Sequence, residues 1–122
     1  MSSRLPPGWP SSVPPAGAPG WTRAASAWLL DLCPPDYRAY DVLRAHPLVL
    51  ARLADEHLQA AIEAARHGLA TARADLRDLV PPEAVAATLT MYEREGARLS
   101  AMRRSVDAVG RALRGERYVP RL

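Results

Sequence analysis

The 122-residue sequence contains no lysine, asparagine or phenylalanine, and it has a single cysteine, Cys33. One cysteine cannot form an intramolecular disulfide or a multi-cysteine metal site, and this usage is typical of a reducing compartment, so we expect the cytosol. No stretch approaches the roughly 20 apolar residues that a membrane span requires, and the start MSSRLPPGWP lacks the apolar segment of a signal peptide. We therefore expect a protein that is neither secreted by that route nor integral to a membrane.

Motifs that bind metals or cofactors are also missing. The sequence has no Gly-rich phosphate loop, no dinucleotide fingerprint, no G-x-S-x-G and no Glu-x-x-His of the kind that builds di-metal sites in helical bundles. The nearest arrangement is Glu63 with His67, preceded by Glu56 and His57, which offers too few ligands and is more simply an exposed helix pair. We expect neither a metal nor a cofactor.

A thiol enzyme is the remaining catalytic possibility, because Cys33 and His46 both lie in the N-terminal half. A lone cysteine between apolar residues is more often a small buried side chain than a nucleophile. We therefore expect no enzyme activity. A small-molecule binder or enzyme, the third-ranked hypothesis, would need a pocket near Trp28, Cys33, Tyr37 and Tyr40.

The composition favours one folded domain rather than a disordered chain, with 48% hydrophobic and 24% charged residues. All sixteen basic residues are Arg, and Ala, Pro and Gly are abundant, as GC-rich codons favour. The choice of Arg over Lys therefore carries little functional information.

Residues 1–20 hold six of the twelve prolines, a density at which neither a helix nor a central strand persists. The sequence therefore predicts an extended Pro-rich arm over 1–20, followed by a single helical domain over 21–122. Trp9 and Trp21 each follow a Pro-Gly pair, and we expect their rings to anchor the arm to the domain's own core or to a partner.

Two short helices are predicted next. The first runs over about 22–33, with Thr22 as its N-cap and Pro34-Pro35 as its stop. The second runs over about 37–45, with Asp36 as its cap, and ends before Pro47, which suits the first turn of another helix. The apolar spacing places these residues on the buried faces: Ala25, Trp28, Leu29 and Leu32 in the first, and Tyr37, Tyr40 and Leu43 in the second.

Two long helices follow, over about 47–80 and 82–114, and together they predict an antiparallel helical hairpin. Glu83 suits the first turn of the second, and Gly115 is its natural stop. At Glu95 and Gly96 an apolar residue is missing, so we expect a kink, a close contact or a polar pairing there. The predicted buried stripe of the first long helix comprises Leu58, Ile62, Ala65, Leu69, Ala72, Leu76 and Leu79. A row of small residues runs beside this stripe: Ala54, Ala61, Ala64, Ala65 and Gly68. The predicted buried stripe of the second long helix comprises Val85, Leu89, Tyr92, Leu99, Met102, Val106, Val109 and Leu113.

Helices of this size are about 45 Å long, whereas a compact domain of this length has a radius of gyration near 13 Å. The hairpin must therefore extend past a globular core and leave apolar surface for a second chain to cover. We expect a homodimer, in which two hairpins form a four-helix arrangement about a two-fold axis. The rival is a monomer whose arm folds back over the hairpin.

Positive charge is concentrated at the C-terminal end, where residues 94–122 hold eight Arg and three acidic residues. The simplest interpretation is a solvated helix face, and the alternatives are binding of a nucleic acid or another polyanion, or of a membrane surface. The favoured hypothesis is a self-associating helical interaction or scaffold module, and a nucleic-acid-associated protein is the alternative. The candidate polyanion-binding residues are Arg103, Arg104, Arg111, Arg114, Arg117 and Arg121.

Overall fold

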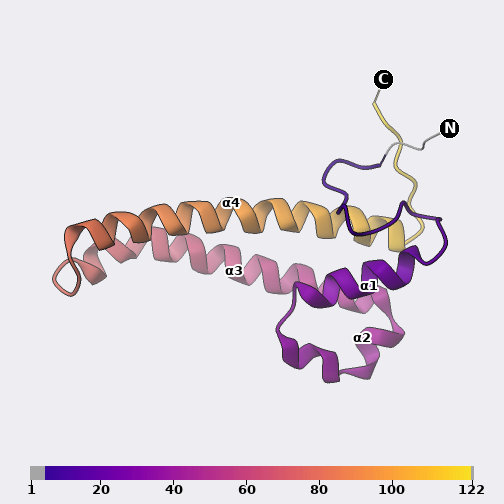
Figure 1. Cartoon of the computed structure of the whole chain (residues 1–122), viewed down its shortest axis with the longest axis horizontal. Coiled ribbons are helices and arrows are strands. Elements are labelled where there is room, and N and C mark those ends of the chain that lie inside the picture. The colour runs from indigo at the N-terminus through magenta and orange to yellow at the C-terminus, as the bar shows by residue number, and fades with distance from the viewer. Residues whose placement is uncertain (1–4, 122) are drawn as a thin grey trace.

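The computed structural model describes residues 5–121, and its regular structure is entirely helical within that range. Helix α1 (Trp21–Asp31) is followed by a 3-10 helix, η1 (Pro35–Ala39), and a single-turn helix, α2 (Asp41–Ala45). Helices α3 (Pro47–Leu76) and α4 (Pro82–Leu113) then form the predicted antiparallel hairpin. The hairpin projects well beyond α1 and α2, and the first and last described residues lie at the α1 end (Figure 1). No helix within 5–121 is long and apolar enough to cross a membrane.

The hydrophobic core lies at one end of the hairpin, where α1 packs against both α3 and α4. Along α3 the main cluster of buried residues ends at Ile62, and along α4 it begins at Leu99. We call residues 47–62 and 99–113 the proximal half of the hairpin and residues 63–98 the distal half. The largest fully buried side chains are Leu29, Leu43, Leu50, Leu58, Val106 and Val109, all in the proximal half or the elements that pack on it.

The start of α1 differs from the prediction. The helix begins at Trp21, and its N-cap is Gly20, whose left-handed backbone (φ 76°) suits glycine, so Thr22 is not the cap. Residues 5–20 contain no helix or strand and run through turns closed by backbone hydrogen bonds, such as Trp9 N–H to the Pro6 carbonyl. Residues 1–4 of the predicted arm lie outside the described residues.

The predicted helix over 37–45 was wrong as a continuous element. Pro35 opens a 3-10 turn in which Asp36 makes no capping hydrogen bond, and Tyr40 takes an extended conformation that separates η1 from α2. Only Leu43 of the predicted face is buried, while Tyr40 is 53% exposed. A segment that buries one side chain gains too little from packing to sustain a longer helix.

The predicted end of α3 was four residues too late, because the helix stops at Leu76. Pro81 disfavours helical backbone at the residue before it, and the chain unwinds through a turn in which Leu79 N–H donates to the Leu76 carbonyl at 2.9 Å. Leu79, predicted to be buried, is therefore 75% exposed, and Leu69 is also exposed at 38%.

Helix α4 is continuous through the predicted irregularity. Glu95 pairs with Arg98 one turn later, so a polar pairing is what the structure has there, and nothing lies close to the position of a Cβ at Gly96. The end is as predicted, because Gly115 has φ 84° and donates to the Ala112 carbonyl at 2.9 Å.

Gly68, in the small-residue stripe of α3, lies close to α4. A Cβ added to Gly68 would lie 2.3 Å from the Tyr92 ring, so only glycine leaves room for this ring. Ala54 and Ala65 of the same stripe are buried, whereas Ala64 is exposed. The stripe therefore lets the two helices pack closely over part of its length.

Candidate interaction surface

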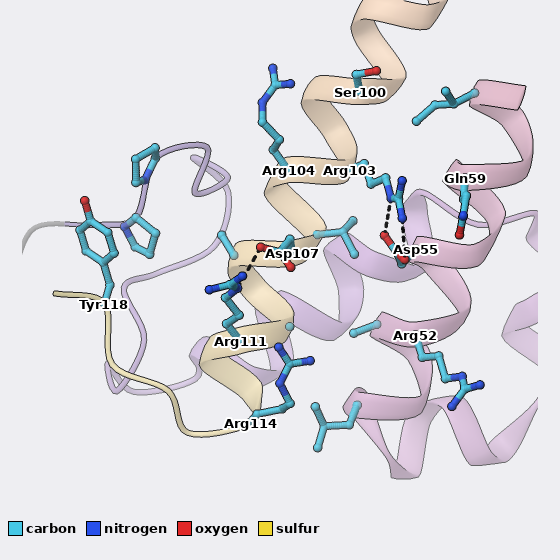
Figure 2. A pocket seen from close by; sticks show the side chains of 18 of the residues that line it. Arg52, Asp55, Gln59, Ser100, Arg103, Arg104, Asp107, Arg111, Arg114 and Tyr118 are labelled. Atoms are coloured by element: carbon cyan, nitrogen blue, oxygen red, sulfur yellow. Dashed lines mark hydrogen bonds and ion pairs between the residues drawn. The ribbon is translucent and has the colours of Figure 1, made fainter. Parts of the chain in front are cut away.

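A groove runs between α3 and α4 along the proximal half of the hairpin and reaches just past it, to Arg66 on α3, with a volume of about 1050 Å³. Its lining residues come from α3, α4, the arm and the C-terminal tail, and none comes from α1 or α2. Figure 2 shows Asp55 on α3 and Arg103 on α4 pointing toward each other across this groove, with Gln59 and Ser100 one turn further along the same two helices. Because α1 packs on the hairpin without lining the groove, the groove lies on a surface of the hairpin that α1 leaves open.

Helical periodicity explains why the groove is charged. Its α3 border is formed by Arg52, Asp55, Gln59 and Arg66, which recur at intervals of three, four and seven residues and so share one face. On α4 the same spacing aligns Arg104, Asp107 and Arg111, and Arg114 follows at the C-cap. In total the lining contains six Arg and three carboxylates: Arg52, Arg66, Arg103, Arg104, Arg111 and Arg114 with Asp55, Glu63 and Asp107.

The groove has an apolar floor beneath this charged border. Ala51, Ile62, Val106 and Ala108 are each less than one-tenth exposed, and Gly110 adds no side chain. Leu48 lies at the α3 end and is 46% exposed. Small residues dominate the floor, so the groove is a hollow between the two helices.

One ion pair crosses the groove. Arg103 donates from Nε to Asp55 Oδ1 at 2.9 Å and from Nη2 to Asp55 Oδ2 at 3.5 Å, and this pairing raises the pKa of Arg103. The two residues are 48 positions apart in the sequence. Arg103 is one of the candidate polyanion-binding residues, and its pairing with Asp55 was not predicted from the sequence. A heptad alignment of the two helices is the signal that could have paired them.

The other five candidate arginines differ in their partners. Arg111 pairs with Asp107 and Arg114 with Glu116, each at 3.0 Å. Arg104 lines the groove, points away from both labelled ion pairs in Figure 2, and forms no ion pair with a described residue. The remaining two, Arg117 and Arg121, lie in the exposed C-terminal tail rather than in this groove.

A second groove, of about 810 Å³, lies between the arm and the C-terminal tail and is lined by Trp9 and Trp21. Their ring centroids are 6.2 Å apart, and both side chains pack, partly buried, against the core. Trp9 Nε1 donates to the Val13 carbonyl at 2.9 Å, and Val13 is only 3% exposed. Thus the sequence-predicted anchor residues lie together against the core, while nothing in the sequence singled out Val13.

The residues considered for chemistry are not brought together in either groove. Trp28, Cys33, Tyr37 and Tyr40 line neither of them. Burial raises the pKa of the Cys33 thiol, the opposite of what a thiolate nucleophile needs. His57 packs edge-on against Tyr37, and the described residues contain no group of three or more His, Cys, Asp or Glu side chains that could hold a metal ion.

Comparison of the chain with protein-family models, with curated proteins and with solved structures found no match. The protein can therefore be classified only by its fold: it is an all-helical protein built on a long antiparallel hairpin, with a basic groove along the proximal half of that hairpin.

Proposed function

We propose that this protein is a helical interaction module that self-associates through the distal half of its hairpin. The observation that carries the proposal is the small apolar core between the two helices of that half. Its buried residues are only Ala65, Ala72 and Val85. Long helices are held mainly by packing of an apolar face, and two helices that bury such small side chains leave much of that packing unmade.

Uncovered apolar side chains in the same region support this proposal. Leu69 is 38% exposed, Met91 is 52% exposed, and Leu79 at the turn is 75% exposed. A second copy of the hairpin would cover such side chains in a four-helix arrangement, and two-fold symmetry is the commonest solution for soluble dimers.

The single, buried cysteine fits a reducing compartment, and we propose the cytosol as the place where the module acts.

Light scattering coupled to size exclusion tests self-association directly. At a protein concentration of about 50 μM we expect twice the one-chain mass of 13.3 kDa. Leu69→Glu should convert the dimer to a monomer, because an unpaired carboxylate is costly to bury in an apolar contact. The matched control is Val119→Glu, at a residue 78% exposed in the tail, which should leave the dimer intact. A one-chain mass for the unmodified protein would refute the proposal.

A nucleic-acid-associated role is the second candidate, supported by Arg104, which holds no ion pair with a described residue, and by the surplus of Arg around it. A labelled generic DNA duplex should then bind with an affinity that falls steeply between about 50 and 200 mM salt. Replacing Arg104, Arg111 and Arg114 together by Gln should abolish that binding while the circular dichroism spectrum stays the same. Unchanged affinity in this triple variant would rule out the groove as the phosphate-binding surface.

A further inference from the structure

We propose that the groove of the proximal half binds an amphipathic helix with an acidic polar face, supplied by a different protein. This extends the interaction role proposed above from a second copy to a second kind of partner. The shape of the groove, its apolar floor and its charge each suit such a helix.

The shape is that of a helix-binding surface. Two adjacent antiparallel helices leave a hollow between them on each side, and a third helix about 10 Å across packs into such a hollow. Helix α1 already packs on both helices of the hairpin, where it buries Ala25, Leu29 and Leu30. The groove offers a second hollow along the same stretch, and nothing within residues 5–121 fills it.

The length of the groove sets the length of its ligand. On α3 the lining runs from Leu48 to Arg66. Eighteen residues of helix correspond to about 27 Å, so the matching ligand is a helix of about five turns. The floor of Ala51, Ala108 and Gly110 brings the ligand backbone close, and Leu48 supplies an exposed apolar contact at one end.

The positive charge of the groove favours a ligand with negative charge. The lining holds six Arg and three carboxylates, and Glu56 and Glu116, just outside it, pair with two of those Arg. The groove therefore keeps a surplus of one positive charge, that of Arg104, which has no ion-pair partner among the described residues. Five of the six Arg already pair within the chain, and exposed pairs of this kind are weak, so an incoming carboxylate can share them. A second copy placed groove to groove would set these surpluses against each other, which disfavours self-association at this surface.

A nucleic acid fits the groove less well than a helix does. Phosphate binding uses the cations and gains nothing from an apolar surface, whereas here the apolar floor of Ile62, Val106 and Ala108 lies between the two rows of charge. An amphipathic helix uses both features at once, with its apolar stripe on the floor and its carboxylates on the Arg rows. The observations therefore favour a protein partner.

The test uses two synthetic helical peptides of about 18 residues, with leucine at the a and d positions and glutamate, in the control lysine, at e and g. Both peptides repel their own copies equally, so peptide self-association does not separate them. Fluorescence anisotropy with the full-length protein should show the glutamate peptide binding at least about tenfold more tightly than the lysine peptide. Equal affinities, or tighter binding of the lysine peptide, would overturn the proposal.

Matched variants locate the binding site. Arg104→Glu should weaken binding of the glutamate peptide about tenfold, whereas Arg77→Glu, the same charge change at an exposed residue outside the groove, should change it less than about twofold. Leu48→Ser should weaken binding, and Val42→Ser, at a residue 50% exposed on α2, should not. Equal effects within either pair would show non-specific attraction and overturn the assignment to the groove.

Two further outcomes separate this proposal from the others. A labelled DNA duplex that binds through Arg104 while the glutamate peptide does not bind would overturn the helix proposal in favour of phosphate. Leu69→Glu, which should dissociate the dimer, should leave peptide affinity unchanged, because Leu69 does not line the groove. Loss of peptide binding in Leu69→Glu would place the peptide on the distal half and contradict the proposal.

Discussion

The two halves of the hairpin have the same secondary structure and very different cores. In the proximal half, α1 and the segment around Val13 add a third layer, and large side chains such as Leu50 and Leu58 are almost fully buried. In the distal half two helices pack alone and bury only alanines and a valine. Helical periodicity therefore specifies where a helix forms, whereas burial depends on whether a third element is present to cover its face.

A pair of leucine-to-alanine changes tests this comparison with the largest expected effect. Leu58→Ala removes a side chain that is 2% exposed and should lower the free energy of unfolding by about 2 to 5 kcal/mol. Leu69→Ala, at a residue 38% exposed in the distal half, should cost about 1 kcal/mol or less in protein dilute enough to be monomeric. Urea unfolding followed by circular dichroism measures both.

The outcome for Leu69→Ala is informative in either direction. A small loss supports a distal half that is weakly packed in the isolated chain. A loss as large as that of Leu58→Ala would break the comparison, because it would mean that Leu69 is covered in solution. Repeating the measurement over a range of protein concentrations would then identify a second copy as the cover, since only a dimer makes stability depend on concentration.

Two glycines of the distal half provide a second, smaller test. Gly68→Ala would place a Cβ 2.3 Å from the Tyr92 ring and should cost about 1 to 3 kcal/mol, since the ring must move. Gly96→Ala meets nothing within 4 Å and should gain about 0.5 to 1 kcal/mol from helix propensity. Thermal unfolding by calorimetry distinguishes the two signs.

The Gly68 result needs a control for its cause. If the ring contact is responsible, Gly68→Ala should cost much less in a Tyr92→Ala background than in the natural one. A stabilising Gly68→Ala would contradict the close contact and would mean that the helices separate easily at this point. The distal half would then be looser than the structure indicates.

The sequence predicted best the features that depend on many residues at once. Both long helices, the hairpin and the stop at Gly115 follow from repeated apolar spacing and from one glycine in a left-handed conformation. Short segments were harder, because a single tertiary contact decides them. The extended backbone at Tyr40 divides the predicted second helix, and the unwinding before Pro81 exposes Leu79.

The candidate site was predictable in its charge and not in its pairing. Spacing alone places Arg104, Arg111 and Arg114 on one face, and all three line the groove. The crossing pair of Arg103 and Asp55 depends on the axial alignment of α3 with α4, which the turn at 77–81 sets. This alignment depends on the residue at which α3 ends. Because the end of α3 was predicted four residues too late, the pairing of Arg103 with Asp55 could not be predicted either.

The smallest expected effect concerns Cys33, which lies on the proximal side of the comparison and is 8% exposed. Burial raises the pKa of its thiol in the folded protein, so the unfolded chain loses this proton at lower pH than the folded one. The contribution to stability is therefore fully present below about pH 9 and declines as the pH rises through the folded pKa. Urea midpoints at about pH 7.5 and pH 10 should fall more for the natural protein than for Cys33→Ala, which lacks the thiol but keeps every other titrating group. Equal falls would mean that the thiol ionises as easily in the folded chain as in the unfolded one, and that this edge of the proximal core admits water.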